Sequence, residues 1–209
     1  AYMATNEALD SAGLDKATLK DLEAGILYGN DSTSKAVIDA VKKVEEKKDT
    51  TLLGSGAVFQ CMNSNVSMNL ATMFGLTGVN FTISGACASG SHSIGMAYLL
   101  IKMGLQKLVV CGGAQEVNKE GYTSFDGISA FSMRESEPEK ASRPFDKDRD
   151  GLIPSGGAAT VIVESLESAK ARGANILAEI IGYGFSSNGE HISKPNKEGQ
   201  LKSLNNAIK

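Results

Sequence analysis

Residues 79–97 read VNFTISGACASGSHSIGMA and place a cysteine, Cys87, between an apolar run and a helical pattern. The β-branched and aromatic residues 79–83 predict a buried strand, and residues 88 to about 103 predict a helix. A thiol at such a strand-to-helix turn faces the positive end of the helix dipole, which stabilises its thiolate form. Because the flanking side chains are small, the sulfur is accessible, and Cys87 is the candidate nucleophile.

The rest of the chain continues the alternation of strands and helices. Further strands are predicted at 24–29, 108–111, 158–163 and 178–183, and helices at 3–12, 33–47, 58–74, 166–172 and from about 198, with 118–156 rich in loops. This alternation is typical of βαβ units, and the apolar strands indicate a mostly parallel sheet covered by helices on both faces. In the helix 33–47, we expect a buried stripe and a charged, solvated face. The predicted stripe is Val37, Ile38, Val41 and Val44.

Composition narrows the function classes. The chain has 209 residues, 42% hydrophobic and 22% charged, with a net charge of −3, as in a soluble globular protein. That charge argues against a general nucleic-acid binder, and no apolar run approaches the roughly 18 residues that cross a membrane. No signal peptide is visible, and three cysteines without a CxxC favour a reducing, cytoplasmic location without a structural metal site.

The other small-residue and cysteine motifs have structural interpretations. Cys61 and Cys111 are expected to be small buried hydrophobes. Gly54-Ser55-Gly56 lacks the Lys-Ser/Thr of a phosphate loop, and Gly112-Gly113 lacks the third glycine of a dinucleotide turn. We expect the Gly112-Gly113 doublet to let the chain turn tightly beneath a neighbour.

The chain has only two histidines to serve as a base for Cys87. His92 follows Cys87 by five residues, which advance a helix about 7.5 Å and turn it about 140° off the starting face. His92 is therefore expected to be a buried, hydrogen-bonded structural residue. His191 lies in a polar loop and is either simply exposed or close to a cleft.

Residues 140–151, KASRPFDKDRDG, concentrate opposite charges in a loop. One interpretation is a surface cluster of ion pairs. The other is a fixed loop whose Arg and Asp residues tie strands together beside a cleft, because Arg pairs with carboxylates in a specific geometry.

Residues 84–95 and 141–151 together resemble two hallmark segments of the β-ketoacyl-[acyl-carrier-protein] synthases. Gly112-Gly113-Ala114, Phe125-Asp126-Gly127 and residues 178–184 are similar in order and spacing. The resemblance implies a thiolase-like layered α/β fold with a parallel-rich mixed sheet. The charged run is similar to that of the elongating condensing enzymes.

The resemblance implies an acyltransferase of fatty acid biosynthesis in which Cys87 takes an acyl group from acyl carrier protein. The acyl group then condenses with malonyl-carrier protein, with loss of carbon dioxide. Substrates travel on the carrier's phosphopantetheine, and no separate cofactor or metal is implied. The resemblance also implies a homodimer that associates around the Cys87 strand. An acyl pocket is implied at Ser32, Gly121, Phe125 and Ile128.

The family's two catalytic histidines and its lysine match no residue of this sequence; His92 matches a different family histidine. We therefore expect residues 1–209 to be a single partial synthase domain, mostly the N-terminal half. Such a chain is expected to acylate at Cys87 without condensing. Two alternatives stay open: a non-catalytic, chain-length-factor-like partner of a condensing enzyme, and a Cys/His hydrolase using Cys87 and His191.

Overall fold

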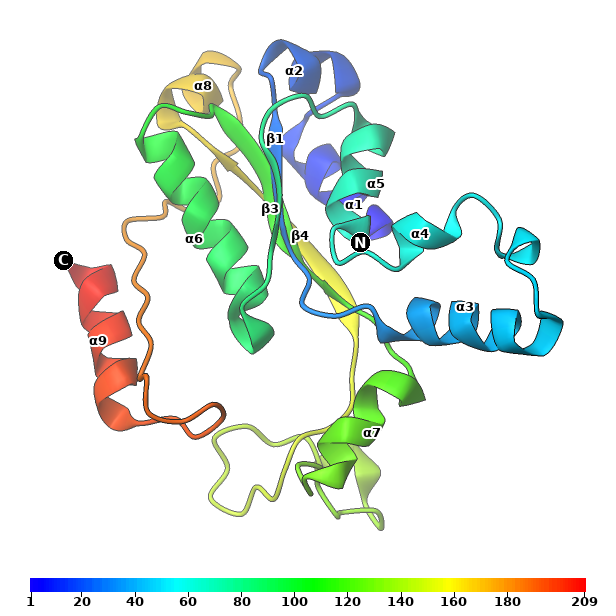
Figure 1. Cartoon of the computed structure of the whole chain (residues 1–209). Coiled ribbons are helices and arrows are strands. Elements are labelled where there is room, and N and C mark those ends of the chain that lie inside the picture. The colour runs from blue at the N-terminus through cyan, green and yellow to red at the C-terminus, as the bar shows by residue number, and fades with distance from the viewer.

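The computed structural model describes residues 1–209 and builds them around one four-stranded sheet (Figure 1). The helices are α1 (Tyr2–Ala12), α2 (Lys16–Asp21), α3 (Ser34–Lys47), α4 (Ala57–Gln60), α5 (Asn65–Phe74), α6 (Ser89–Lys102), α7 (Lys119–Gly127), α8 (Leu166–Ala171) and α9 (Lys197–Ile208), with 3-10 turns η1 (Thr51–Leu53), η2 (Ala86–Ala88) and η3 (Pro138–Lys140). The strands are β1 (Gly25–Gly29), β2 (Asn80–Ile83), β3 (Leu108–Gln115) and β4 (Gly157–Glu164). The strand order is β2-β1-β3-β4, with β1 parallel to β2 and β3 and β4 antiparallel to β3. The predicted parallel-rich mixed α/β sheet is confirmed.

The sheet separates two hydrophobic cores. On one face, the larger core joins the sheet to α1, α2 and α5; its buried residues are Leu9, Leu14, Leu19, Ala24, Ile26, Tyr28, Leu70, Phe74, Leu108 and Val110. On the other face, the smaller core packs under α6 and consists of Leu27, Ala97, Val109 and Cys111. Because successive side chains of a strand point to opposite faces, the apolar strands β1 and β3 supply both cores.

A chain of hydroxyl groups crosses the larger core. The fully buried Tyr28 of β1 contacts the Thr160 hydroxyl of β4 at 2.9 Å, and Thr160 contacts the Thr5 hydroxyl of α1 at 3.0 Å. Burial raises the pKa of the Tyr28 phenol. Since buried hydroxyls without partners are costly, these contacts make the polar atoms compatible with the core and link α1 to both strands.

The N-terminal end of α6 lies directly on the sheet because Gly29, Gly90 and Gly113 meet there. A Cβ on Gly29 of β1 would lie 2.5 Å from the backbone of Ser89 and Gly90, and one on Gly113 of β3 would lie 3.2 Å from the Gly90 Cα. The predicted tight turn at Gly112-Gly113 is wrong, because both residues lie within β3. They are small because α6 and the neighbouring strand β4 press against them.

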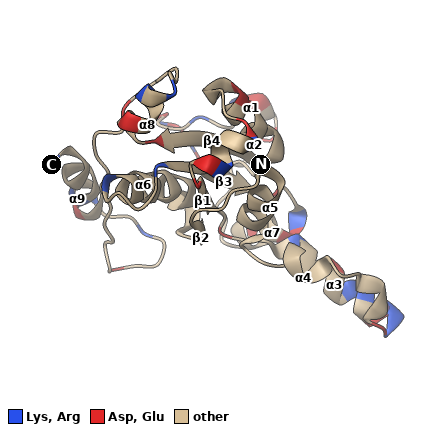
Figure 2. Cartoon of the chain, turned by 90° about the horizontal axis from the view of Figure 1, so that it is seen from above, with Lys and Arg blue, Asp and Glu red and all other residues tan.

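Helix α3 does not bury its apolar stripe. It extends away from the sheet (Figure 2), and Val37 and Val41 are 42% and 50% exposed. The helix follows the predicted bounds closely, and its lysines and glutamates are mostly exposed as predicted. Its amphipathic pattern therefore predicted the helix correctly, but the apolar side is only partly covered, with Ile38 and Val44 partly buried.

Three further boundaries differ from the predictions. The helix predicted over 58–74 is divided into α4 and α5 by a turn at 61–64, and the loop-rich stretch 118–156 contains α7. Residues 178–183 form no strand, and the sheet does not extend to them. The apolar Leu177 and Ile181 of this segment are 82% and 87% exposed.

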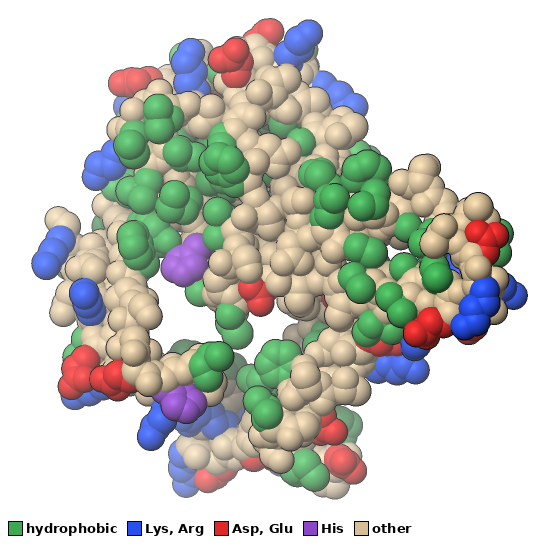
Figure 3. Space-filling model, in the orientation of Figure 1, with side chains coloured by type: hydrophobic (Ala, Val, Ile, Leu, Met, Phe, Trp, Pro, Cys, Tyr) green, Lys and Arg blue, Asp and Glu red, His purple; other side chains and the backbone are tan.

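The apolar strands predicted a sheet that helices cover on both faces, but parts of the sheet are exposed. β2 is an edge strand, and Phe81 on it is 58% exposed. Figure 3 shows apolar side chains gathered over α6 on the face turned to the viewer. Met96 of α6, and Met103 and Leu105 just after it, are exposed. None of the helices is both long and apolar enough to cross a membrane.

Cys111 is fully buried in the smaller core, and burial raises its pKa from 9.0 to about 12. The unfolded chain ionises this thiol first, so the stability that it contributes is intact below pH 9 and is lost as the pH rises from 9 towards 12. In that range the free energy of unfolding falls by up to about 1.4 kcal/mol per pH unit. We expect the free energy of unfolding of Cys111→Val to fall less steeply than that of the parent between pH 9 and 11, measured by urea unfolding.

Cys111→Ala is the matched control, because it lacks the thiol but packs worse. It should be less stable than Cys111→Val at pH 7.5 and should show the same shallow pH dependence. A parent slope retained in both variants would contradict the prediction.

Candidate functional site

Cys87 lies where the sequence places it, at the turn between β2 and α6. It is the middle residue of η2, its thiol is exposed, and the 14-residue helix α6 begins two residues later. The peptide dipoles of α6 direct partial positive charge towards this end of the helix. Among the three cysteines, only Cys87 is both exposed and next to a helix N-terminus, as its predicted role requires.

The turn before Cys87 has a strained backbone. Ala86 has φ of 50°, in the left-handed region that residues with a Cβ rarely adopt. The Ser89 hydroxyl accepts the Gly85 N–H at 2.9 Å and donates to the Ala86 carbonyl at 2.6 Å. A sharp, strained turn between a strand and a helix is a common way to present a nucleophile.

Asp31, which follows β1, also holds this turn, although the sequence pattern does not mark it as a functional residue. Its Oδ1 accepts the hydroxyl of Ser84 and, at 3.1 Å, the N–H of Ala86. The signal available in the sequence was the polar turn at 30–32, which directly follows a buried strand. Loops after the carboxyl ends of parallel strands tend to gather functional side chains.

A pocket of about 500 Å³ opens beside Cys87. Its wall is built from residues 29–31 after β1, 113–115 at the end of β3, 157–159 at the start of β4, and the head of α6. Because β4 is antiparallel, its start lies at the same edge of the sheet as the ends of β1 and β3. The many glycine and alanine residues leave the space open next to the sulfur.

The two histidines do not serve Cys87. His92 is partly buried, and its Nδ1 lies 2.6 Å from the hydroxyl of Tyr183, which agrees with the predicted hydrogen-bonded structural role. The exposed His191 accepts the backbone N–H groups of Ser193 and Lys194 at its Nδ1. Neither histidine lines the pocket that contains Cys87.

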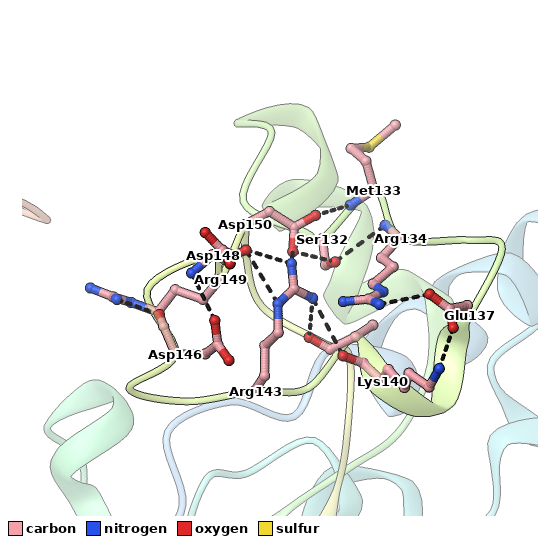
Figure 4. A network of polar contacts seen from close by, with 11 residues as sticks. Ser132, Met133, Arg134, Glu137, Lys140, Arg143, Asp146, Asp148, Arg149 and Asp150 are labelled. Carbon is pink, nitrogen blue, oxygen red and sulfur yellow. Dashed lines mark hydrogen bonds and ion pairs between the residues drawn. The ribbon is translucent and has the colours of Figure 1, made fainter.

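Residues 132–150 form a polar network in which loops are tied to one another (Figure 4). Arg143 pairs with Asp150 at 2.9 Å and donates to the backbone carbonyls of Asp148 and Ala141. Hydrogen bonds from the Ser132 hydroxyl and the Met133 N–H, together with Arg143, hold the pKa of Asp150 below its usual value. The charged run is therefore tied to itself and to residues 132–133, as in a surface cluster of ion pairs, and none of residues 140–151 lines the Cys87 pocket.

The predicted acyl-pocket residues lie outside the wall of the Cys87 pocket. Ser32 and Gly121 come from segments that do meet, because a Cβ on Gly121 would lie 3.4 Å from the Ser34 hydroxyl. Phe125 packs against Phe131 with ring centroids 6.3 Å apart, and Ile128 is 71% exposed. An acyl pocket at these four positions stays a prediction.

Glu116 joins the starts of α3 and α7, where Ser32 and Gly121 lie. Its Oε1 accepts the N–H of Ser34 at 2.8 Å and the Ser34 hydroxyl at 3.1 Å. Burial alone would raise the pKa of Glu116, but hydrogen bonds from Asn118, Ser34 and Lys35 outweigh it and lower the pKa. The ionised carboxylate is therefore the form that binds the two segments together.

No group of three or more His, Cys, Asp or Glu side chains is arranged to hold a metal ion.

Comparison with known proteins agrees with this geometry. The family model described as "Beta-ketoacyl synthase, N-terminal domain" matches residues 1–169. The chain is 40% identical to 3-oxoacyl-[acyl-carrier-protein] synthase 1 of Haemophilus influenzae, over 100% of this chain and 52% of that protein. The chain thus spans about half the length of the curated relatives it matches.

Two solved structures share the fold. A β-ketoacyl synthase from Burkholderia phymatum superposes with a TM-score of 0.90 at 38% identity, over 99% of this chain and 51% of that one. A ketosynthase in complex with its type II polyketide acyl-carrier protein superposes with a TM-score of 0.85 at 23% identity, over 98% and 53%. The thiolase-like layered fold predicted from the sequence is confirmed.

Asp150→Ala should loosen the charged loop, because Arg143, Ser132 and Met133 lose their shared acceptor. Phe145 at the tip of this loop is 98% exposed, so chymotrypsin cleavage after it reports local opening. We expect Asp150→Ala to be cleaved there several-fold faster than the parent. The matched control is Asp148→Ala, whose backbone carbonyl still accepts from Arg143 and which should be cleaved at the parental rate; equal rates for both variants would contradict the prediction.

Proposed function

The chain belongs to the β-ketoacyl synthase family, and we propose that its Cys87 is the acyl-accepting nucleophile of a decarboxylative condensing enzyme. The observation that carries this proposal is the exposed thiol at the head of α6, beside a pocket walled by small residues. The strained turn at Ala86 adds to it, because such strain persists where a structure must present a group in one orientation.

The proposed reaction has two steps. The Cys87 thiolate attacks the carbonyl carbon of an acyl thioester, the bond to the carrier's phosphopantetheine sulfur breaks, and the carrier leaves as its thiolate, which takes a proton from solvent. A malonyl thioester then loses carbon dioxide, its carbanion attacks the acyl carbon on Cys87, and the Cys87 thiolate is released. The Cys87 N–H donates one hydrogen bond to the oxyanion of each tetrahedral intermediate.

The proposed partner is an acyl carrier protein, and the proposed setting is fatty acid biosynthesis in the cytoplasm. The support is the name of the Haemophilus influenzae relative, which is a 3-oxoacyl-[acyl-carrier-protein] synthase. The carrier brings the reactive group on its own phosphopantetheine, so we propose that the enzyme needs no cofactor or metal of its own. We propose that residues 1–209 form part of a single synthase domain.

Two other functions are less well supported. A non-catalytic, chain-length-factor-like partner would have no use for an exposed cysteine at a helix N-terminus. A Cys/His hydrolase would need His191 beside Cys87, whereas the Nδ1 of His191 is occupied by the backbone of its own loop. Labelling of Cys87 by a cysteine-directed synthase inhibitor separates the condensing enzyme from the non-catalytic partner.

We also propose that two copies of the chain associate through the edge of β2. This strand pairs with β1 on one side only, and Phe81 exposes an apolar ring there. An open hollow of about 810 Å³ lies beside it, lined by residues 61–64 and 80–84. An exposed edge strand is a template for pairing with another chain, and a two-fold axis would join both sheets into one.

Cys87→Ala should abolish transfer of an acyl group from acyl-carrier protein to the chain, because no other thiol is both exposed and at a helix N-terminus. Intact-protein mass spectrometry after incubation with acyl-carrier protein measures the mass gain. Cys61→Ala is the matched control and should acylate like the parent. Acylation that persists in Cys87→Ala would overturn the assignment of the nucleophile.

The same incubation, with malonyl-carrier protein added, tests the second step. Because neither histidine of residues 1–209 lines the Cys87 pocket, this chain by itself should acylate without yielding a ketoacyl product. Appreciable product from the 209-residue chain would show that the decarboxylation machinery is already present within it.

Phe81→Lys should shift the chain towards monomer, because it places a charge on the proposed two-fold edge. Sedimentation velocity at several protein concentrations measures the shift. Met103→Lys is the matched control, since Met103 is also exposed but lies at the end of α6. A dimer retained by Phe81→Lys, or lost equally in both variants, would count against β2 as the interface.

A further inference from the structure

We propose that Asp31 is a positioning residue that holds the Cys87 turn in its reactive conformation. This inference rests on the proposed role of Cys87 and adds a residue from a different strand. Asp31 follows β1, yet its side chain binds the turn 53 and 55 residues further along the chain, through Ser84 and Ala86. Asp31 and Cys87 also line the same pocket.

The turn needs an external anchor because its conformation is unfavourable. The left-handed φ of Ala86 is disfavoured for a residue with a Cβ, and such a residue keeps that φ only where its surroundings enforce it. The Asp31 Oδ1 accepts the Ala86 N–H itself and the adjacent Ser84 hydroxyl. Hydrogen bonds to a carboxylate are stronger than those between neutral groups, so this acceptor suits a strained turn.

The second anchor, Ser89, cannot take over this role. Its hydroxyl contacts only Gly85 and Ala86, within four residues, and so it shapes the turn locally. The Asp31 contacts are long-range and join the turn to the sheet. They set where the Cys87 sulfur lies relative to β1 and to the wall of the pocket.

Asp31 is itself held in place by its neighbours. The buried Asn30 donates its amide to the Asn63 carbonyl at 2.7 Å, and the Asn63 amide donates to the Asp31 carbonyl at 3.2 Å. These two hydrogen bonds tie the Asn30 side chain and the Asp31 backbone carbonyl to Asn63, and so support the backbone that carries the carboxylate. A group that positions a nucleophile needs such support.

The Asp31 carboxylate places a negative charge near the thiol and also accepts hydrogen bonds from the turn. Two variants are needed to separate the effect of the charge from the effect of the hydrogen bonds. Asp31→Asn keeps an oxygen acceptor and removes the charge. Asp31→Ala removes both. The two variants are equally neutral, so a difference in Cys87 reactivity between them reports the acceptor alone.

The experiment measures alkylation of Cys87 by iodoacetamide in the 209-residue chain, followed by peptide mass spectrometry. Alkylation of Cys61 in the same molecules is the internal reference. We expect Cys87 in Asp31→Ala to react about tenfold more slowly than in Asp31→Asn, the size of effect that follows loss of one hydrogen-bond acceptor. Cys61 should react at the same rate in both. Equal Cys87 rates in the two variants would overturn the proposal.

Asp15→Ala is the matched control for a merely structural effect. The Asp15 Oδ1 also accepts one backbone N–H and one hydroxyl, both from Thr18, at the start of α2. We expect this variant to alter thermal stability while leaving Cys87 alkylation unchanged. A drop in Cys87 alkylation equal to that of Asp31→Ala would overturn the proposal.

Where Asp31→Ala melts below the assay temperature, Ser84→Ala replaces it, because it removes one of the two donors and keeps the carboxylate. Its Cys87 should then react several-fold more slowly than the parent, and an unchanged rate would overturn the proposal. Alkylation needs no carrier protein and no condensation. The alkylation rates therefore test the role of Asp31 even if the chain proves not to accept an acyl group. The positioning role and the proposed function can each be wrong without the other.

Discussion

The close approach of α6 to the sheet is the constraint on which the site depends. Gly29, Gly90 and Gly113 remove the side chains that would separate the helix from β1 and β3, and a Cβ on Gly29 would collide with the α6 backbone at 2.5 Å. Because Cys87 immediately precedes this helix, the same contact sets the height of the sulfur above the strand ends. The pocket beside it exists because its wall carries so few large side chains.

Cys87 and Cys111 show how strongly the environment of a residue decides its role. Cys111 is sealed in the smaller core, where burial raises its pKa to about 12, and it serves packing. Cys87 lies outside that core, exposed at a helix N-terminus on a strained turn. The local pattern around Cys87, with an apolar run before it and small residues beside it, was sufficient to distinguish the two. The different roles proposed for the two cysteines therefore follow from where the backbone places each of them.

Two predictions of burial were wrong, and both concern apolar patterns that the rest of the chain does not fully cover. Residues 178–183 have the apolar character of a strand, but the sheet does not extend to them. Helix α3 has a clear amphipathic stripe, yet Val37 and Val41 remain exposed. An apolar periodicity reports that a face is suited to burial. It carries no information about which surface will bury it, and that surface is absent from these parts of the chain.

Local sequence determined the strands and helices of the sheet layer and singled out Cys87 as the candidate nucleophile, because periodicity, small residues and helix signals act over a few neighbouring residues. It also identified the charged loop whose Arg143 and Asp150 pair. Only the tertiary structure brought Asp31 to Ser84 and Ala86, and His92 to Tyr183, across separations of 53 to 91 residues. Such contacts depend on strand order and on how closely α6 packs, and neither quantity is encoded in any single stretch of the chain.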